Sequence, residues 1–396
     1  MRKVVIVEAV RTAIGSFGGS LADVPAVELG AHVVREAVRR SGIDPIEVSE
    51  VIMGNVLQAG LGQNPARQAA IRGGLPESVP SYTVNKVCGS GLKAIALAVL
   101  SVAAGESEIV VAGGMENMSQ APHLLMQTRK GYRLGHGELV DSLISDGLWD
   151  AFYDIHMGIT AENIAEKFRF SRTELDEFAA RSQARAQSAQ EEGRFQEEIV
   201  PYLVPRRKRE PLTFDRDEGV KGDTTMEKLS ALRPAFQSGG VVTAGNASTL
   251  NDGASAVLIM SGERAKRLGL KPMAVITSYA SAGCDPRLMG LGPVPAVQAT
   301  LQKAGWTMQD IDLFEMNEAF AAQALGVAVE LGLPMERVNV NGGAIALGHP
   351  IGASGARIVT TLLHEMNKRD LKRGIAGLCI GGGQGMAMAF EREPQP

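Results

Sequence analysis

The sequence predicts an α/β fold made of two duplicated halves, with a separate segment inserted between them. Short apolar runs alternate with helical stretches along the chain, which is typical of layered α/β proteins. Two parts of the chain repeat each other at a distance of about 262 positions. The middle of the chain matches neither part.

Six short apolar runs are expected to form buried strands, separated by Ala-rich or amphipathic helices. These runs are residues 4–7, 51–53, 109–112, 256–260, 313–316 and 375–380. The first run begins like a secretory signal, but Glu8 and Arg11 end the apolar stretch early. We therefore expect it to be a buried first strand.

The repeat indicates that the two halves contain strand, turn, helix, strand and glycine turn in the same order. The matching segments are 41–48 with 304–311, 53–55 with 315–317, 88–91 with 349–352 and, at a slightly larger offset, 112–114 with 380–382. In this alignment Cys88 and His349 occupy equivalent turns.

Residues 118–249 differ in character from both halves. We divide the chain into an N-terminal half (1–117 plus 250–270), the inserted segment (118–249) and a C-terminal half (271–396). The insert carries a polar helix that opens with a capping box, Ser171 with Glu174, and stops near Gly193. Its basic run 206–209 favours a solvated strand edge, because edges are commonly charged and Glu210 follows; a site for an anionic ligand is the alternative.

Composition argues against several classes of protein. The chain has 396 residues, with 40 lysines and arginines against 44 acidic residues and a net charge of -4, so it is not an obvious nucleic-acid binder. Three cysteines without a CxxC pair indicate neither a disulfide framework nor a zinc site, and the reducing cytoplasm fits them best. No run approaches the roughly 20 apolar residues of a membrane-spanning helix.

Cys88 is a candidate nucleophile. It lies in a glycine-rich turn between an expected strand, 81–84, and an expected helix, 92–104, which is apolar all round and ends at Gly105. The helix N-terminus would lower the pKa of the thiol, and the glycines would allow a substrate to approach. The alternative is a small buried hydrophobic residue.

His349 and Cys379 lie in the other glycine-rich segments. His349 belongs to the densest of them, 341–355, and a histidine beside a cysteine makes an activated nucleophile. A hydrogen-bonded turn residue is the alternative. Cys379 ends an expected strand and leads into a triple-glycine turn, whose backbone amides could form an oxyanion hole. Both cysteines are expected to expose their sulfur.

Five segments, taken together, resemble the signature segments of the thiolases. They are 84–91, 113–119, 317–320, 342–355 and 379–385, and they span almost the whole chain in order. The resemblance implies a five-layer αβαβα arrangement of two similar βαβαβ-type halves, with a loop domain inserted in the first. It also implies ping-pong acyl transfer between coenzyme A thioesters.

The resemblance also implies roles for individual residues. Cys88 would take an acetyl group from acetyl-CoA while His349 accepts its proton, and Cys379 would deprotonate a second acetyl-CoA. The enolate would then attack the acylated Cys88. His349 and a water held by Asn317 would stabilise the enolate, and the amides of Cys88 and Gly381 would stabilise the tetrahedral intermediate.

Substrate binding is implied for nine further residues. They are Leu148, His156, Met157, Lys221, Phe236, Ala244, Ser248, Met289 and Phe320. Ser248 would contact the pantetheine arm, and Lys221 would meet the phosphates of the nucleotide. Met289 and Phe320 would limit the acyl pocket to short chains, with ordinary core packing as the alternative for both. Lys228 departs from the family, since biosynthetic relatives often have serine there.

An acetyl-transferring thiolase implies acetyl-CoA, acetoacetyl-CoA and CoA as its ligands, with no metal or prosthetic group. It also implies a homotetramer, whose contacts would come from the segment 120–137. Two alternatives remain open. A degradative 3-oxoacyl-CoA thiolase of fatty-acid β-oxidation would use the same catalytic residues, whereas a non-catalytic acyl-CoA-binding protein would keep only the fold.

Overall fold

A computed structural model describes residues 2–207 and 209–393 of the chain. Over these residues one mixed sheet of ten strands runs through the molecule in the order β14-β15-β16-β13-β1-β12-β5-β3-β4, with β2 paired to β12. The strands are β1 (Val4–Arg11), β2 (Gly15–Ser16), β3 (Glu50–Gly54), β4 (Ser81–Val84), β5 (Ile109–Asn117), β12 (Asn251–Ser261), β13 (Ala274–Gly283), β14 (Leu313–Met316), β15 (Arg373–Ile380) and β16 (Gln384–Glu391). The six apolar runs and the segment 81–84, all expected to be strands, are confirmed.

Two long strands, β13 and β16, were not expected. β16 consists mainly of alanine, methionine and glycine, and alanine and glycine are depleted in strands. Composition does not account for β13 in the same way, because its first six residues include valine, isoleucine, threonine and tyrosine, which favour strands. The strands form because each pairs with neighbours that are remote in the sequence, such as β1 with β13.

The two halves of the sheet have equivalent strands in the same order on either side of the β1–β13 pair. These strands run antiparallel, with Val5 opposite Val275. On one side follow β12, β5 and β3, and on the other β16, β15 and β14. In both halves the outermost of these pairs, β3–β5 and β14–β15, is parallel. The duplication inferred from the sequence is thus visible as a pseudo-twofold arrangement.

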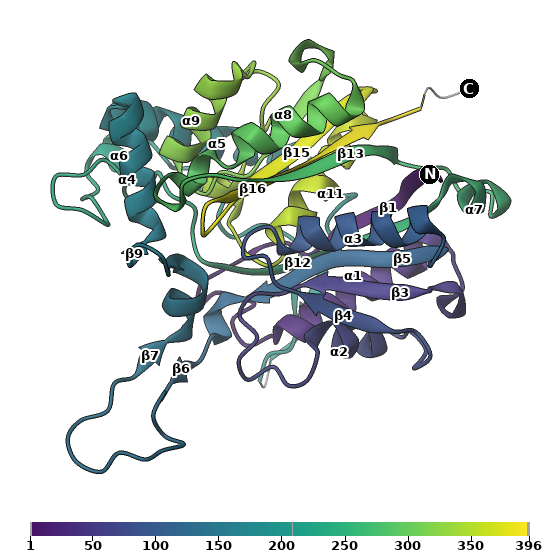
Figure 1. Ribbon diagram of the computed structural model, residues 1–396, viewed down its shortest axis with the longest axis horizontal. Helices are drawn as coiled ribbons and strands as arrows, with labels where there is room; N and C mark the ends of the chain where they lie inside the picture. Colours follow the sequence, from purple (N-terminus) through teal and green to yellow (C-terminus); the bar gives the residue numbers. More distant parts are fainter. Residues whose placement is uncertain (1, 208, 394–396) are drawn as a thin grey trace.

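Helices complete the layers around and between the half-sheets (Figure 1). One outer layer holds α1 (Ala26–Ser41) and α2 (Pro65–Arg72), and the other holds α8 (Pro293–Ala304) and α9 (Ala321–Leu331). The central layer contains α3 (Ser90–Ala104) and α11 (Ser354–Lys368), packed between strands of both halves. The five-layer fold class is confirmed. Shorter helical segments are η1 (Pro45–Glu47), α7 (Gly262–Arg267), η4 (Pro286–Leu291), η5 (Met308–Asp310) and α10 (Ala344–Leu347).

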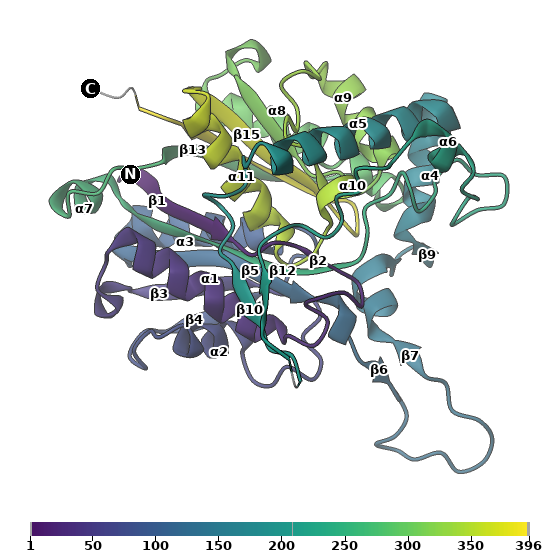
Figure 2. The same cartoon turned by 180° about the vertical axis from the view of Figure 1, so that it is seen from behind.

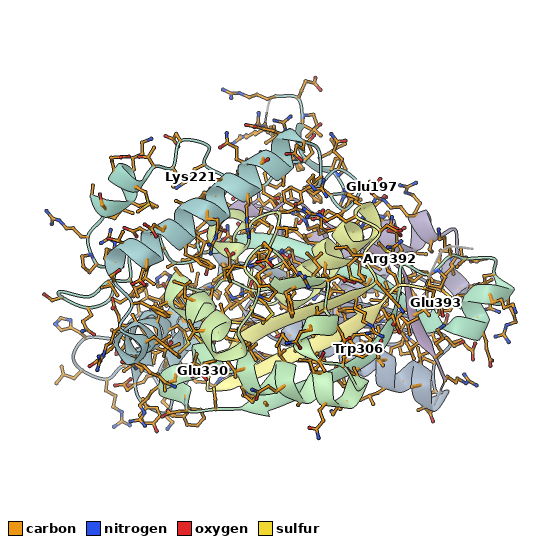
Figure 3. All side chains as sticks on the ribbon, turned by 90° about the horizontal axis from the view of Figure 1, so that it is seen from above. Glu197, Lys221, Trp306, Glu330, Arg392 and Glu393 are labelled. Atoms are coloured by element: carbon orange, nitrogen blue, oxygen red, sulfur yellow. The ribbon has the colours of Figure 1, made fainter. Side chains whose placement is uncertain are left out.

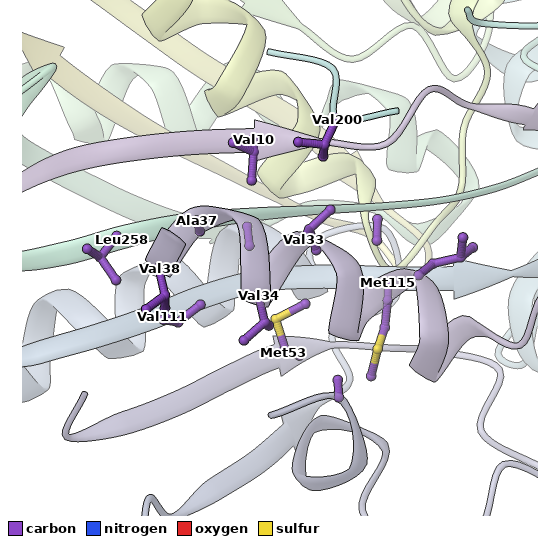
Figure 4. Packing of buried hydrophobic residues seen from close by; sticks show 14 of the residues in the cluster. Val10, Val33, Val34, Ala37, Val38, Met53, Val111, Met115, Val200 and Leu258 are labelled. Carbon is purple, nitrogen blue, oxygen red and sulfur yellow. The ribbon is translucent and has the colours of Figure 1, made fainter. Parts of the chain in front are cut away.

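Helix α1 shows how an outer layer is held. Val33, Val34, Ala37 and Val38 form its buried stripe and pack on β3, β5 and β12 (Figure 4). Each fully buried valine contributes about 1.5–3 kcal/mol relative to an exposed one. The helix ends at Gly42, whose φ of 71° is readily adopted only by glycine.

Helix α3 is the most apolar helix of the described chain. Residues 87–104 reach a mean hydropathy of 1.9 over 18 residues, enough by length and composition to cross a membrane, which the sequence analysis did not anticipate. Here the helix forms part of the central layer, and its predicted burial and its end at Gly105 are confirmed. It crosses α11 closely, since a Cβ on Gly91 would lie 2.8 Å from the Ala356 nitrogen.

The crossing of α3 and α11 also corrects the repeat alignment. A Cβ on Gly355 would lie 2.3 Å from the Leu92 nitrogen, which mirrors the contact of Gly91 with Ala356. The two helices are thus related by an offset of 264, so Cys88 aligns with Gly352 and not with His349. The proposed match of 112–114 with 380–382 is likewise wrong, because the ladders place Gly113 opposite Met53 and its counterpart Gly377 opposite Met316.

The segment 118–249 contains short elements and two longer helices. They are η2 (Met118–Gln120), β6 (His123–Leu124), β7 (Val140–Asp141), η3 (Leu143–Leu148), β8 (Trp149–Asp150), β9 (Ile155–His156), α4 (Met157–Phe168), α5 (Arg172–Glu191), β10 (Tyr202–Val204), β11 (Leu212–Phe214) and α6 (Met226–Ser230). The chain between β6 and β7 extends away from the body as an arm (Figures 1 and 2). The capping box of α5 is confirmed, and Gly193 follows the helix with a φ of 69°.

The basic run is not a strand edge. Arg206, Arg207 and Arg209 are exposed in the connection between β10 and β11, and Lys208 lies outside the described residues. The two strands stop on either side of the run, so that its charges stay in water. The division of the chain at 117/118 and 249/250 stays a prediction.

Candidate active site

A cavity of about 820 Å³ lies where the inserted segment meets both halves. Thirteen of the fourteen predicted site residues line it, all of them within the described chain. They are Cys88, Leu148, His156, Met157, Lys221, Phe236, Ala244, Ser248, Met289, Phe320, His349, Cys379 and Gly381. The exception is Asn317, which is buried behind His349.

Cys88 occupies a tight turn between β4 and α3. The preceding Val87 has a φ of 47°, an uncommon conformation for a β-branched residue. Hydrogen bonds on both sides of Val87 hold this conformation: its amide donates to Asn85 Oδ1 at 2.9 Å, and Ser90 Oγ donates to its carbonyl at 2.6 Å. The turn therefore aims the Cys88 side chain into the cavity at the start of a helix.

The predicted lowering of the Cys88 pKa is wrong. Burial raises the pKa of Cys88 to about 11, although the backbone amides of Gly381 and of Cys88 itself hydrogen-bond to the sulfur. Loss of solvation disfavours the thiolate by more than these amides favour it. At neutral pH Cys88 is therefore a neutral thiol, and it would require a base to act as a nucleophile.

His349 is in the right form to be that base. It is buried in the long turn before α11, with its backbone amide donating to Asn251 Oδ1 at 2.9 Å and its Nδ1 2.6 Å from Ser354 Oγ. Burial, reinforced by the nearby Arg357 cation, lowers the pKa of His349 to about 3. The imidazole is neutral at physiological pH and can accept a proton.

Asn317 contacts the imidazole of His349 without lining the cavity. Its Nδ2 lies 3.5 Å from His349 Nδ1 and 3.4 Å from Nε2, so the amide sits against the ring and not in line with either nitrogen. Its Oδ1 is buried and has no hydrogen-bonding partner among the described residues. This free polar atom next to His349 is suited to hold a water.

Cys379 lies at the closed end of the cavity, near the end of β15. It is only 1% exposed, so the expected exposure of its sulfur is wrong. Burial, reinforced by the neighbouring Cys88 thiol, raises the pKa of Cys379 well above its ordinary value. Beyond it the chain turns through Gly382 and Gly383, whose φ values of 82° and 79° require glycine. Once formed, the Cys379 thiolate is a strong base.

An apolar cluster surrounds Cys379. It comprises Met157, Ala161, Val242, Ala247, Met289, Ala319, Phe320 and Cys379. His156 stacks on Phe236 with ring centroids 4.9 Å apart, and Phe236 meets Phe320 edge-on at 6.1 Å. Most of these side chains line the cavity together with the two thiols and give this part of its wall an apolar character.

Charged side chains also line the cavity, namely Lys221, Asp223 and Lys228. Lys221 lies exposed beside α5 (Figure 3), where its backbone amide donates to Gln183 Oε1 at 2.8 Å. Lys228 is exposed nearby and pairs with Asp223. Two cations at the mouth of a mainly apolar cavity suit a ligand with an apolar arm and an anionic head.

Several lining residues were not anticipated. They include Ser16, Phe17, Met118, Gln183, Asp223, Thr224, Leu229, Leu232, Ala235 and Ile351. Phe17 is 55% exposed and comes from the loop after β1, more than seventy positions before Cys88. The sequence signal for such a residue would be a periodic spacing of hydrophobic residues, and a loop has no such period.

Comparison with known proteins identifies the family. Residues 4–263 match the family model of the thiolase N-terminal domain, and residues 270–392 match that of the thiolase C-terminal domain. The acetyl-CoA acetyltransferases of Cupriavidus necator and Pseudomonas aeruginosa are 60% and 61% identical to this chain, and each alignment covers 99% of it and 100% of the relative. The crystal structure of the Bacillus anthracis acetyl-CoA acetyltransferase matches with a TM-score of 0.97 at 49% identity, covering 99% of both chains. The predicted family is confirmed, and this chain belongs to the thiolases.

Proposed function

We propose that this protein is an acetyl-CoA C-acetyltransferase that interconverts two acetyl-CoA with acetoacetyl-CoA and CoA. The observation that carries the proposal is that two thiols and a neutral imidazole line the same cavity. The names of the relatives in Cupriavidus necator and Pseudomonas aeruginosa support it.

The first half-reaction transfers an acetyl group to Cys88. His349 takes the proton of the Cys88 thiol, and the thiolate attacks the thioester carbon. The amides of Cys88 and Gly381 stabilise the oxyanion that forms, a contribution of about 3 kcal/mol per donor in other enzymes. When the carbon–sulfur bond to CoA breaks, Cys379 gives its proton to the leaving thiolate. Acetyl-Cys88, imidazolium and the Cys379 thiolate remain.

The second half-reaction forms the carbon–carbon bond. The Cys379 thiolate removes a proton from the methyl group of a second acetyl-CoA, and its raised pKa makes it a competent base. The imidazolium of His349 and a water at Asn317 stabilise the enolate oxygen. The enolate attacks acetyl-Cys88, and the departing Cys88 thiolate recovers its proton from His349. Every proton is thereby returned, and no external acid or base is consumed.

The pocket favours a short acyl group. Met289 and Phe320 are 3% and 8% exposed and pack around Cys379 with Met157, which leaves little room beyond a methyl or acetyl group. Outside the catalytic cluster, Ser248 lies on the cavity wall with its amide bonded to the Ala319 carbonyl at 2.9 Å, where a pantetheine arm would pass.

The proposal is tested by measuring the rates at which the protein thiolyses two substrates, acetoacetyl-CoA and a long-chain 3-oxoacyl-CoA of about 16 carbons. We expect acetoacetyl-CoA to have the higher kcat/KM by at least about tenfold. Cys88→Ser serves as the control for uncatalysed thiolysis. A preference for the long chain would instead establish the degradative thiolase, and the absence of an acetyl adduct on Cys88 in mass spectra would establish the non-catalytic binding protein.

The protein is further proposed to be a tetramer, a dimer of dimers. The arm between β6 and β7 exposes Leu125, Met126, Leu134 and Leu139, by 51%, 70%, 100% and 60% respectively. A projecting segment with this many exposed large apolar side chains is suited to pack against another copy of the chain.

A further inference from the structure

Successive residues of β14 face opposite layers of the fold. Leu313 belongs to the central core cluster, whereas Phe314 and Met316 belong to the outer cluster that includes α8 and α9. Glu315 and Asn317 continue the alternation of Leu313 and therefore face the central layer, where α11 lies. The strand thus presents two polar side chains to α11 and the turn before it, about 7 Å apart along its axis.

Both polar side chains have a partner on the side of α11. Glu315 Oε1 accepts from Arg357 Nη1 at 2.8 Å, and both side chains of this ion pair are 3% exposed. Asn317 Nδ2 lies 3.4 Å from Nε2 of His349, in the turn that leads into α11. Among the residues that the structure describes, the ion pair makes the one hydrogen bond between α11 and β14. It is therefore the polar contact next to the Asn317–His349 contact.

Other hydrogen bonds hold Asn317 and His349 separately, each to a different half of the fold. The His349 amide donates to Asn251 Oδ1 on β12 at 2.9 Å, in the N-terminal half. The Asn317 amide donates to the Gly377 carbonyl on β15 at 2.9 Å, in the C-terminal half. These bonds do not fix Asn317 relative to His349. The ion pair does, because it joins α11 to β14.

The ion pair is better suited to fixing a register than to stabilising the fold. Only Nη1 of Arg357 is hydrogen-bonded, since Nε and Nη2 have no partner among the described residues. The buried Arg11, in contrast, bonds both oxygens of Asp217 at 2.7 and 2.9 Å and Glu198 Oε1 at 2.6 Å. A buried ion pair with unpaired nitrogens gains little stability, because the lost hydration is not replaced; setting register is the best-attested use of such pairs.

We propose that Arg357 and Glu315 are positioning residues, whose ion pair sets the register of α11 against β14 and thereby brings Asn317 to the ring of His349. The register itself is independent of the proposed function. Its effect on catalysis rests on that function, because Asn317 and His349 together stabilise the enolate there.

Crystal structures of the wild type and of the double variant Arg357→Met/Glu315→Leu test the register directly. Replacing a buried ion pair by apolar residues of similar volume is often neutral or stabilising, so we expect the denaturant midpoint of the double variant to be no lower than that of the wild type. We expect Asn317 to contact the His349 ring in the wild type and to lose this contact in the double variant. An unchanged contact in the folded double variant would overturn the proposal.

Arg357→Lys is the second variant, because it keeps the charge and one donor for Glu315. The wild-type pair uses only one nitrogen of Arg357, so we expect the lysine variant to keep the Asn317–His349 contact. Loss of the contact in Arg357→Lys, with its ion pair to Glu315 formed, would contradict the proposal.

Kinetics provide the second readout. Exchange of the methyl protons of acetyl-CoA for deuterium measures enolate formation, and dividing by the amount of acetyl-Cys88 corrects for unfolded protein. In the double variant we expect the exchange rate per acetylated site to fall about 10- to 100-fold, with the KM for acetyl-CoA little changed. Arg357→Lys should keep most of the rate. A double variant that exchanges at the wild-type rate would show that the pair is only structural.

Thr360→Val is the matched control, since it removes a buried hydroxyl of α11 that bonds Ser255 on β12 and makes no contact with β14. We expect its exchange rate per acetylated site to match the wild type. Equal losses in Thr360→Val and the double variant would show a general effect of α11 packing and would overturn the proposal. If the Asn317–His349 contact depends on the ion pair but Cys88 is not acetylated even in the wild type, the proposed function fails while the register assignment stands.

Discussion

At the scale of single residues, different surroundings support the different roles proposed for two identical thiols. Cys88 is partly buried and receives two backbone amides, whereas Cys379 is 1% exposed within an apolar cluster. Both pKa values are raised by burial. Cys88 therefore needs His349 to form its thiolate, and Cys379 becomes a strong base once it has lost its proton.

Replacing Cys379 by serine should separate the two half-reactions. A serine hydroxyl is too weak an acid to form the required base, so we expect acetoacetyl-CoA synthesis to fall by at least about 10³-fold. Acetylation of Cys88 should persist and can be read as a mass increase on that residue. Cys284→Ser is the control, because this third described thiol lies outside the cavity lining. Condensation at near wild-type rate in Cys379→Ser would rule out its role as the base.

The buried His349 makes stability depend on pH. Its pKa is lowered from the ordinary 6.5 to about 3, so between these values the unfolded chain binds a proton that the folded chain does not. The free energy of unfolding must therefore fall as pH falls. Lowering the pH from 7.5 to 5.5 should reduce the free energy of unfolding by about 1.4 kcal/mol through this group alone.

This loss of unfolding free energy can be measured by denaturant unfolding of the wild type and of His349→Gln at the two pH values. The wild type should lose about 1.4 kcal/mol more than the variant on acidification, since all other groups are common to both. Equal losses in the two proteins would show that the imidazole is not held neutral by the fold.

At the scale of elements, the turn before α3 stores strain next to the nucleophile. The φ of 47° at Val87 costs about 1–2 kcal/mol for a residue with a Cβ. The hydrogen bonds from Ser90 and to Asn85 maintain it. Such strain persists where the surrounding contacts over-determine the backbone, as at a turn that must aim a reactive side chain.

Val87→Gly and Val87→Ala measure this strain. Both remove the side chain that packs in the central core, but only glycine adopts the positive φ freely. We expect Val87→Gly to be more stable than Val87→Ala by about 1 kcal/mol in denaturant unfolding. We also expect a lower kcat in Val87→Gly, because a looser turn aims Cys88 less accurately. Greater stability of the alanine variant would contradict the strained conformation.

At the scale of the whole molecule, the arm is the feature that a single copy does not explain. The arm extends away from the body (Figures 1 and 2), and four of its large apolar side chains are exposed. Burying each of them would contribute about 1.5–3 kcal/mol. In the proposed tetramer, a second pair of subunits would cover this surface.

Shortening the arm should halve the assembly. Light scattering should give about four times the 41.9 kDa chain mass for the wild type and about twice that mass after residues 125–139 are replaced by a short turn. Leu134→Asp is the matched point variant, since Leu134 is fully exposed in one copy. An unchanged mass in both variants would show that the arm does not hold the tetramer.

Much of this structure could be predicted from local sequence. Strands with consecutive apolar residues, such as β5 and β14, and the capped helix α5 follow from patterns within a few residues. Strand β16 could not, because its residues have weak strand propensity and it forms by pairing with β15 and with the distant β13, whereas the valine, isoleucine, threonine and tyrosine of β13 offered a local signal. The correct alignment of the two repeated halves could not be predicted from the sequence either, because it follows from the contacts where α3 crosses α11.

The sequence by itself indicated the family, the duplicated architecture and three candidate catalytic residues, Cys88, His349 and Cys379, because glycine turns and motif order are local properties of the chain. Only the tertiary structure decided the protonation states of these groups, the pairing of His349 with Ser354 and the walls of the cavity. The physical reason is that desolvation and buried hydrogen bonds arise from packing between remote segments. The sequence predicted an activated thiolate at Cys88, whereas burial makes Cys88 a neutral thiol beside the neutral imidazole of His349.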